Sequence, residues 1–290
     1  KFRRVLFRSN IPIEKTKIDI INKTIPISFV LFKYLHLTYN YQRYNRIINK
    51  SKSQIVQFKK IIYNNIGDNM DDIKKLVNWI KESNRVVFFG GAGVSTESGM
   101  KDFRSATGLY NEKYKYPPET ILSHTFFVNN PEEFFKYYKN KLNSLNYKPN
   151  RTHEVLAKLE KRGYLSSIIT QNIDNLHQKA GSKSVYELHG SIKRNYCTKC
   201  HKKYDEKYIF EYAGIPKCSC GGIVRPDITL YEEPLNEDIY HKAITEIASA
   251  DLLIIGGTSL NVFPATGLIR YFHGKHLVLI NRSSTMYDHL

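Results

Sequence analysis

A glycine-rich segment that directly follows an apolar run constrains the fold of this chain more than any other feature. The run RVVFFG covers residues 85–90, and GAGVSTESG follows it at residues 91–99. A short apolar run of this kind predicts a strand that is buried on both faces of a parallel sheet. Glycine at positions 90, 91 and 93 allows a sharp turn and a close approach of the backbone to a ligand. We therefore expect a ligand-binding turn at the end of this strand.

The composition of this turn suits a dinucleotide. The amides from Ala92 to Thr96 would lie at the start of a helix, where backbone amides attract a pyrophosphate. The turn departs from the G-x-G-x-x-G fingerprint, which would place glycine where Thr96 stands. It also lacks a persuasive acidic residue after the second expected strand to bind a ribose. The motif alone predicts a dinucleotide-type turn of an unusual kind, and a tight turn without a ligand is the alternative.

Four more apolar runs predict strands, and each ends in small or hydrogen-bonding residues. The runs cover residues 165–170, 185–190, 250–260 and 276–282. Helical patterns lie between the strands, notably at 151–162 and 236–249. This alternation predicts an α/β fold with a doubly wound parallel sheet. In such a sheet the ligand binds at the carboxyl ends of the strands, where the segments TQNID, LHG, GGTS and INR fall.

The net charge of +17 is concentrated in the first 69 residues, which hold 14 basic and three acidic residues, a balance of +11. No apolar stretch there reaches the roughly 20 residues that a membrane span needs. We find neither a signal-peptide cleavage site nor an aromatic platform for nucleic acid. The first methionine is Met70, which precedes a helical pattern. We expect residues 1–69 not to be part of the natural protein, a targeting presequence being the alternative, and we expect neither a membrane nor a specific nucleic acid as partner.

Four cysteines form two closely spaced pairs. Two residues separate Cys197 from Cys200, and one residue separates Cys218 from Cys220. Four such thiolates fit a tetrahedral Zn²⁺ site, which is structural because no ligand position stays open for water. The second pair is shorter than the usual C-x2-C, so His201 is an alternative ligand, although we expect it to be solvated. Two local disulfides or free thiols are the other interpretations. Because no secretory signal is evident, we favour zinc and a cytoplasmic protein.

Seven short motifs follow one another within residues 86–282, and the similarity that they carry extends over essentially the whole chain after Met70, about three-quarters of its length. They are GAGVSTESGMKDFRS, TQNIDNLH, LHG, the four-cysteine cluster, RPDITLYEE, GTSLNVFPA and LVLINR. Each motif is weak alone, but the ordered set is specific. In this order they resemble the motifs of the sirtuins, the NAD-dependent protein deacylases, and are most similar to those of the bacterial members.

The resemblance implies a Rossmann-like large domain and a smaller lobe within residues 70–290. The large domain would comprise residues 70–107, 165–190 and 225–290, and the lobe would combine a helical insertion at 108–164 with a zinc module at 191–224. NAD would lie between the two parts, and the acyl-lysine of a protein would enter from the opposite side. The chain ends soon after the fifth strand, where sirtuins continue. We therefore expect a truncated C-terminus that lacks one edge of the sheet and part of the adenine pocket.

The implied function is NAD-dependent removal of acetyl, or another uncharged acyl group, from lysine side chains of proteins. In the family's chemistry, the acyl oxygen attacks the nicotinamide ribose carbon as nicotinamide leaves, and the acyl group ends on ADP-ribose. His189 matches the general base that deprotonates a ribose hydroxyl, since an imidazole with a pKa near 6.5 is largely neutral at physiological pH. The Tyr and Arg pair of desuccinylase-like sirtuins is not evident in residues 108–123, which favours an uncharged acyl group.

The other residues that match the family pattern would bind NAD. Asn172 and Asp174 match the residues that hold the nicotinamide amide, since a carboxamide and a carboxylate complement its donor and acceptor. A helix cap is their alternative role. Phe103 would shield the nicotinamide pocket, and Arg104 would lie beside the phosphates. The remaining expected contacts to NAD are Ala92, Thr96, Gln171, Ile173, Thr258, Ser259 and Asn281.

Met100 and Lys101 depart from the family pattern, which usually reads GIPDFR where this chain reads GMKDFR. Proline fixes the backbone angle φ at its own position. We expect Lys101 to leave this part of the cofactor site more mobile and to weaken the affinity for NAD.

Two other functions fit parts of the sequence. A mono-ADP-ribosyltransferase would use the same NAD site and would differ only in the fate of the ADP-ribose. A non-catalytic NAD or zinc binding module would bind NAD without turnover. The match of His189 beside an acyl-lysine channel favours deacylation. The oligomeric state and the target protein are not readable from the sequence.

Overall fold

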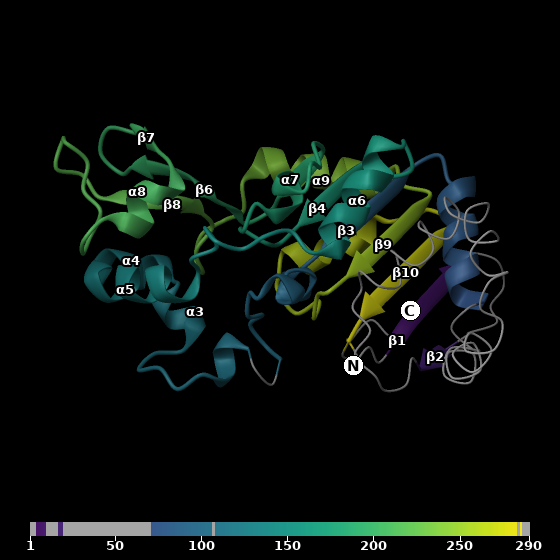
Figure 1. Cartoon of the computed structure of the whole chain (residues 1–290), viewed down its shortest axis with the longest axis horizontal. Helices are drawn as coiled ribbons and strands as arrows, with labels where there is room; N and C mark the ends of the chain where they lie inside the picture. The colour runs from purple at the N-terminus through teal and green to yellow at the C-terminus, as the bar shows by residue number, and fades with distance from the viewer. Residues whose placement is uncertain (1–3, 10–16, 20–70, 106–107, 283–284, 286–290) are drawn as a thin grey trace, which may run out of the picture.

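The protein consists of two parts, each built on its own sheet (Figure 1). The computed structural model describes residues 4–9, 17–19, 71–105, 108–282 and 285. Most of the segment 1–69, to which one of our expectations applies, lies outside the described residues. Across the described part of the chain, every helix is too short or too polar to cross a membrane.

The large sheet contains the five parallel strands that the sequence predicts, in the order β10-β9-β3-β4-β5. These strands are β3 (Val86–Gly90), β4 (Ser167–Thr170), β5 (Val185–Glu187), β9 (Leu252–Gly256) and β10 (His276–Asn281). From β3 the chain passes to β4 and β5, and it later returns to β9 on the other side of β3. The strand order therefore reverses between β3 and β9, where doubly wound sheets bind their ligands. The predicted fold class is confirmed.

Two short strands extend this sheet beyond β10. β1 (Arg4–Ser9) pairs antiparallel with β10, and β2 (Lys17–Asp19) pairs antiparallel with β1. The edge of the sheet next to β10 is therefore paired along this strand.

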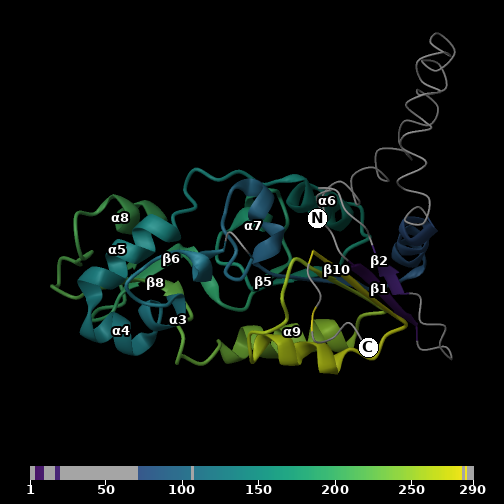
Figure 2. The same cartoon turned by 90° about the horizontal axis from the view of Figure 1, so that it is seen from below.

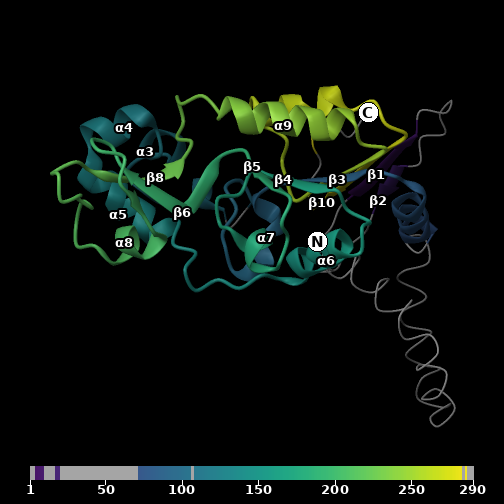
Figure 3. The same cartoon turned by 90° about the horizontal axis from the view of Figure 1, so that it is seen from above.

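Helices cover both faces of the large sheet, because its strands are apolar on both sides (Figures 2 and 3). Val86 and Phe88 of β3 pack in a cluster with the helix at residues 71–82 and with α6 (Arg151–Lys161). Val87 and Phe89 point to the other face, where they pack with α9 (Glu237–Ala248) and the 3-10 helix η4 (Ala265–Tyr271). The alternation follows from the two-residue period of a strand.

The smaller part, which we call the small lobe, is built on a three-stranded sheet of order β7-β6-β8 (Figure 1). Its strands are β6 (Gly190–Cys197), β7 (Lys203–Tyr204) and β8 (Val224–Ile228), and its helices are α3 (Pro118–Ile121), α4 (His124–Asn129), α5 (Pro131–Lys141) and α8 (Glu206–Glu211). Stacked rings join α5 to α8, since the Tyr138 ring lies 5.9 Å from that of Phe134 and 5.4 Å from that of Phe210. Aromatic packing thus ties the helical insertion to the cysteine-bearing sheet.

The helix α6 falls in the stretch that we assigned to the helical insertion, yet it packs on the large sheet. Val155, Leu156 and Leu159 are buried in the same cluster as Phe88 and Ile254. Within the stretch 108–164, the described residues from Leu109 to Leu142, which include α3, α4 and α5, contribute to the core of the small lobe, and the chain returns to the large sheet at α6.

The stacked rings generate a stability prediction. Tyr138 is fully buried, and its hydroxyl has no hydrogen-bond partner among the described residues. Because a buried unsatisfied hydroxyl is costly, Tyr138→Phe should leave the free energy of unfolding unchanged or raise it by about 1 kcal/mol. Phe134→Ala, which leaves a cavity in the same stack, should lower it by about 3–5 kcal/mol. Urea unfolding of both variants tests this, and a clear loss of stability in Tyr138→Phe would show that the hydroxyl is satisfied.

Candidate active site and zinc centre

The turn after β3 crosses the turn after β9 at a very short distance. The Gly93 amide donates to the Gly257 carbonyl at 2.8 Å, and the Gly91 amide donates to the Gly256 carbonyl at 3.2 Å. A Cβ atom on Gly93 would lie only 2.8 Å from the Gly257 oxygen. Glycine is therefore required here by the neighbouring turn, independently of any ligand.

Two 3-10 turns follow β3 in place of the helix that we expected. They are η1 (Ala92–Val94) and η2 (Thr96–Ser98), and Gly99 ends the second turn with a φ of 95°. The expected helix N-terminus is that of a short 3-10 helix and not of an α-helix, because the left-handed Gly99 stops the helical path after these two short turns. Ala92 is half-buried in this turn, whereas Thr96 is exposed and its hydroxyl donates to the Gly93 carbonyl at 3.0 Å.

A buried polar cluster joins this turn to the end of β4. The Ser95 hydroxyl donates to Asp174 Oδ2 at 2.6 Å and accepts a hydrogen bond from Asn172 Nδ2 at 3.0 Å. The second oxygen of Asp174 accepts from the Leu176 amide at 2.9 Å, at the start of the short helix α7 (Leu176–Lys179). Burial raises the pKa of Asp174, and the hydrogen bonds from Ser95 and Leu176 oppose this rise. The cluster can present an amide and a carboxylate to a small polar ligand.

His153 extends this cluster from the first turn of α6. Its Nδ1 accepts a hydrogen bond from the Asn150 amide at 3.2 Å, so the ring proton is on Nε2, which lies 3.5 Å from the Ser95 hydroxyl. Burial lowers the pKa of His153 to about 4, so the ring is neutral at pH 7. Sequence reasoning missed Ser95 and His153. Ser95 lies inside the recognised turn between two residues that we selected, but nothing in the sequence shows that its side chain points inward.

His189 follows β5 and faces the end of β4. Its Nδ1 lies 2.8 Å from the Gln171 carbonyl oxygen, which can only accept a hydrogen bond, so Nδ1 carries the proton. The other ring nitrogen, Nε2, then has a lone pair that can accept a proton. Burial lowers the pKa of His189, and the hydrogen bond to Gln171 opposes this change. The ring remains partly exposed.

Phe103 and Arg104 lie in a segment that is closed by its own backbone. We call residues 101–105 together with 108–112 the cofactor segment. The Tyr110 amide donates to the Phe103 carbonyl at 2.9 Å, and the Leu109 amide donates to the Asp102 carbonyl at 2.9 Å. The Phe103 ring is half-buried beside the Tyr110 ring, and the exposed Arg104 guanidinium lies 5.1 Å from the centre of that same ring.

The remaining predicted residues lie at the ends of β4, β9 and β10 of the large sheet. Thr258 follows β9, and its buried hydroxyl accepts a hydrogen bond from Gln171 Nε2 at 3.1 Å. Ser259 is half-buried beside it, and Asn281 is buried at the end of β10. Ile173 packs against the core of the small lobe. The structure thus gathers the predicted residues of β4, β5, β9 and β10 at one edge of the sheet, with Phe103 and Arg104 in a separate segment.

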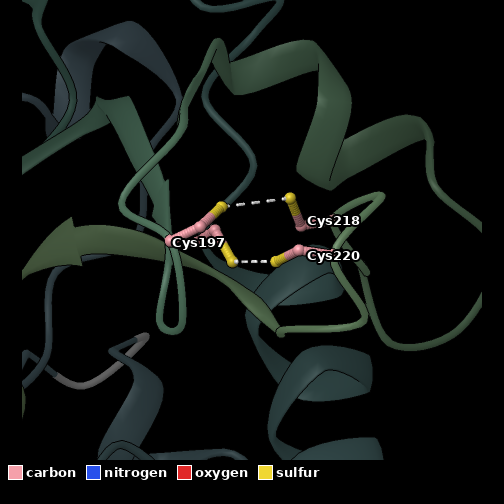
Figure 4. Close-up of side chains that lie close together, drawn as sticks. Cys197, Cys218 and Cys220 are labelled. Carbon is pink, nitrogen blue, oxygen red and sulfur yellow. Dashed lines mark hydrogen bonds between the residues drawn. The ribbon is translucent and has the colours of Figure 1, made fainter.

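The four cysteines meet between the end of β6 and the loop before β8 (Figure 4). The Sγ atoms of Cys197 and Cys220 are 3.5 Å apart, those of Cys200 and Cys218 are 3.6 Å apart, and all four lie within 4.8 Å of one another. A tetrahedral site with Zn–S bonds of about 2.3 Å has edges of about 3.8 Å, whereas a disulfide has sulfurs about 2.05 Å apart. The sulfur geometry therefore fits one zinc ion. His201 is exposed and is not part of the cluster.

Removal of the zinc should loosen the small lobe. The full chain should contain about one zinc per molecule, and Cys200→Ser should reduce the zinc content and the melting temperature, since a closed metal site contributes directly to folding. Thr198→Ala, at an exposed position in the same turn, should change neither quantity. Atomic absorption and calorimetry measure the two effects. A Cys200→Ser protein with full zinc content would contradict the four-cysteine assignment.

Comparison with known proteins agrees with these features. A model described as the Sir2 family matches residues 91–264. A relative from Clostridium perfringens, named NAD-dependent protein deacetylase, is 62% identical over 224 residues, which cover 76% of this chain and 92% of the relative.

Solved structures show the same similarity. A Sir2 variant with a deacetylated p53 peptide and 3′-O-acetyl-ADP-ribose is 40% identical and superposes with a TM-score of 0.69, over 75% of this chain and 89% of that chain. Sir2 with a p53 peptide and NAD⁺ is 39% identical, with a TM-score of 0.66 over 75% of this chain and 89% of that chain. The chain therefore belongs to the Sir2 family.

Proposed function

We propose that this chain removes acetyl groups from lysine side chains of proteins and transfers them to ADP-ribose, with release of nicotinamide. The observation that carries the proposal is the fixed tautomer of His189. Its Nδ1–H is held by the Gln171 carbonyl at 2.8 Å, at the strand ends that also bear Asn172 and Asp174. The names of the relatives and the ligands of the solved Sir2 structures support the same activity.

His189 acts as the general base. Bound NAD supplies the ribose carbon to which the acyl oxygen becomes attached as nicotinamide leaves. The neutral His189 ring takes a ribose hydroxyl proton at Nε2, and the Gln171 carbonyl then stabilises the imidazolium through Nδ1–H. This transfer raises the nucleophilicity of the hydroxyl oxygen, which takes over the acyl group. One water molecule is consumed in this sequence: it supplies the oxygen and hydrogen atoms with which the lysine leaves as a free amine and the acyl group remains as an ester on ADP-ribose.

Asn172 and Asp174 hold the carboxamide of nicotinamide in this proposal. Ser95 fixes both side chains, because its hydroxyl donates to Asp174 and accepts from Asn172. Phe103 covers the site, and Arg104 lies near the phosphates. The two 3-10 turns that begin at Ala92 and Thr96 bind the pyrophosphate. The rest of the NAD site is lined by Gln171, Ile173, Thr258, Ser259 and Asn281.

An extended substrate peptide pairs with the segment at residues 228–231. The Tyr231 amide donates to the Leu122 carbonyl and its carbonyl accepts from the His124 amide, both at 3.0 Å. Arg225 binds both carboxylate oxygens of Glu233, at 2.7 and 3.0 Å, and Arg225 and His124 hold the pKa of Glu233 at about 2 despite its burial. These anchors use most of the backbone groups of residues 228–231 within the protein and fix the segment in an extended position, along which a peptide can lie with little demand on its sequence.

We propose a cytoplasmic location, since a reducing compartment keeps four closely spaced thiols from forming disulfides and leaves them available to zinc. We also propose an uncharged acyl group as the preferred substrate, because the Tyr and Arg pair of the desuccinylase-like sirtuins is not evident in residues 108–123.

The pH dependence follows from the state of His189. The base must be neutral, and burial lowers its pKa from 6.5. The neutral form therefore persists below pH 6.5, and kcat/KM should fall only as the pH drops further. A kcat/KM profile with an acetyl-lysine peptide, whose amide does not titrate, measures the acid limb. A midpoint at or above pH 7 would contradict a buried, neutral base.

Nicotinamide release tests the role of His189. In the presence of an acetyl-lysine peptide the full chain should release nicotinamide from NAD over many turnovers. His189→Ala should lower this steady-state rate by about 100-fold or more, the usual contribution of a general base. His273→Ala removes an exposed histidine outside the site and should retain the activity. If His189→Ala and His273→Ala release nicotinamide equally fast, His189 is not the base.

The same assay separates deacylation from ADP-ribosyl transfer. An ADP-ribosyltransferase would use the same NAD site, formed by the crossing turns of Gly91 and Gly257. A transferase would release nicotinamide without the acetyl-lysine peptide and would leave ADP-ribose on a protein side chain. A binding module would bind NAD and release no nicotinamide.

A further inference from the structure

The carboxylate of Glu112 binds two lysines from different parts of the chain. One of its oxygens accepts a hydrogen bond from the Lys101 ammonium, and the other accepts from the Lys141 ammonium at 2.5 Å. Lys101 stands at the start of the cofactor segment and Glu112 at its end. Lys141 is the last residue of α5 in the small lobe. The three charges therefore connect both ends of the cofactor segment to the small lobe, and we call them the charge brace.

The brace is more shielded than an ordinary surface ion pair. The Glu112 side chain is 20% exposed and that of Lys141 is 30% exposed, while Lys101 is 56% exposed. The hydrogen bonds from Lys101 and Lys141 lower the pKa of Glu112, so the carboxylate is ionised at neutral pH. A shielded carboxylate shared by two ammonium groups forms a small network, and such networks contribute more than isolated pairs.

The brace closes the base of the cofactor segment. Within it, the backbone bonds from Leu109 to Asp102 and from Tyr110 to Phe103 join the two sides of the segment. The Lys101–Glu112 pair adds the next connection beyond Asp102. Phe103 and Arg104, which contact NAD in the proposed function, thus directly follow the Lys101–Glu112 pair and the Asp102 backbone bond, and the Phe103 carbonyl is itself held by the Tyr110 amide.

We propose that Glu112 is a positioning residue for NAD: together with Lys101 and Lys141 it holds the cofactor segment in the conformation that binds NAD. The inference rests on the proposed function, because it takes Phe103 and Arg104 as contacts to NAD. It replaces our expectation that Lys101 only loosens this segment. Where the family pattern fixes the backbone with proline, this chain holds the segment by charge.

The test compares Glu112→Gln, Lys101→Met and their double variant in the full chain. Glu112→Gln should raise the KM for NAD by about three- to tenfold, the range expected for a partly screened ion-pair network, with kcat changed by less than about twofold. The double variant should resemble Glu112→Gln alone, because both substitutions remove the same pair. Lys101→Arg keeps the charge and should keep the KM for NAD close to that of the unmodified protein.

Salt provides a second readout that a merely structural role would not give. Between about 50 mM and about 500 mM salt, the KM for NAD should rise more steeply in the unmodified protein than in Glu112→Gln, because salt screens the brace that the variant lacks. Glu206→Gln is the matched control. Glu206 pairs with Lys193 at 3.0 Å in the small lobe, with side chains 15% and 52% exposed. It should alter neither the KM for NAD nor its salt dependence.

An unchanged KM for NAD in both Glu112→Gln and Lys101→Met, with or without a lower melting temperature, would overturn the inference. Lys101→Met keeps the test decisive if Glu112→Gln folds poorly, because Lys101 is the most exposed member of the brace. Calorimetric titration with NAD gives the dissociation constant without turnover. If the proposed deacetylation fails, the unmodified protein will show no turnover, while the effect of Glu112→Gln on NAD binding will still decide the inference.

Discussion

The contact between two backbone turns is the constraint on which the site depends. Because the Gly93 amide donates a hydrogen bond to the Gly257 carbonyl, the ends of β3 and β9 are fixed side by side. The end of β4 joins them through Gln171, whose amide donates to Thr258, and the Ser95 cluster adds a second link to the turn after β3. Three strand ends are thus connected by short polar contacts before any ligand binds. Such preorganisation spares the protein the cost of ordering these groups upon binding.

The electrostatic environments of the buried cluster and of His189 suit different tasks. Asp174 is 3% exposed, and its two oxygens accept from Ser95 and Leu176, which fixes the carboxylate as an acceptor of oriented hydrogen bonds. A group held this way is suited to recognising a neutral amide. His189 is partly exposed and has one nitrogen committed to Gln171, so it can exchange a proton through the other. The four-cysteine cluster lies apart from both groups, and a zinc ion bound there would stabilise a lobe whose own sheet has three strands.

Apolar runs and strand-end residues were enough to predict the parallel sheet and the edge at which the polar residues gather, because both follow from local periodicity. The four-cysteine cluster could also be predicted, because its four ligands lie close together in the sequence. The inward direction of Ser95 was not readable, because it depends on the crossing of two glycine turns that are far apart in sequence. The packing of α6 on the large sheet depends likewise on distant apolar neighbours. The ion pairs of Glu112 with Lys101 and Lys141 join two segments that are far apart in sequence. The sequence therefore showed Lys101 as a replacement for proline and gave no sign of its partner.

The fate of the acetyl group tests the central claim most directly. We would incubate the full chain with NAD and an acetyl-lysine peptide and measure the products by mass spectrometry. The account predicts equal amounts of nicotinamide, deacetylated peptide and O-acetyl-ADP-ribose. Free acetate formed without nicotinamide, or ADP-ribose attached to a protein while the peptide keeps its acetyl group, would contradict it.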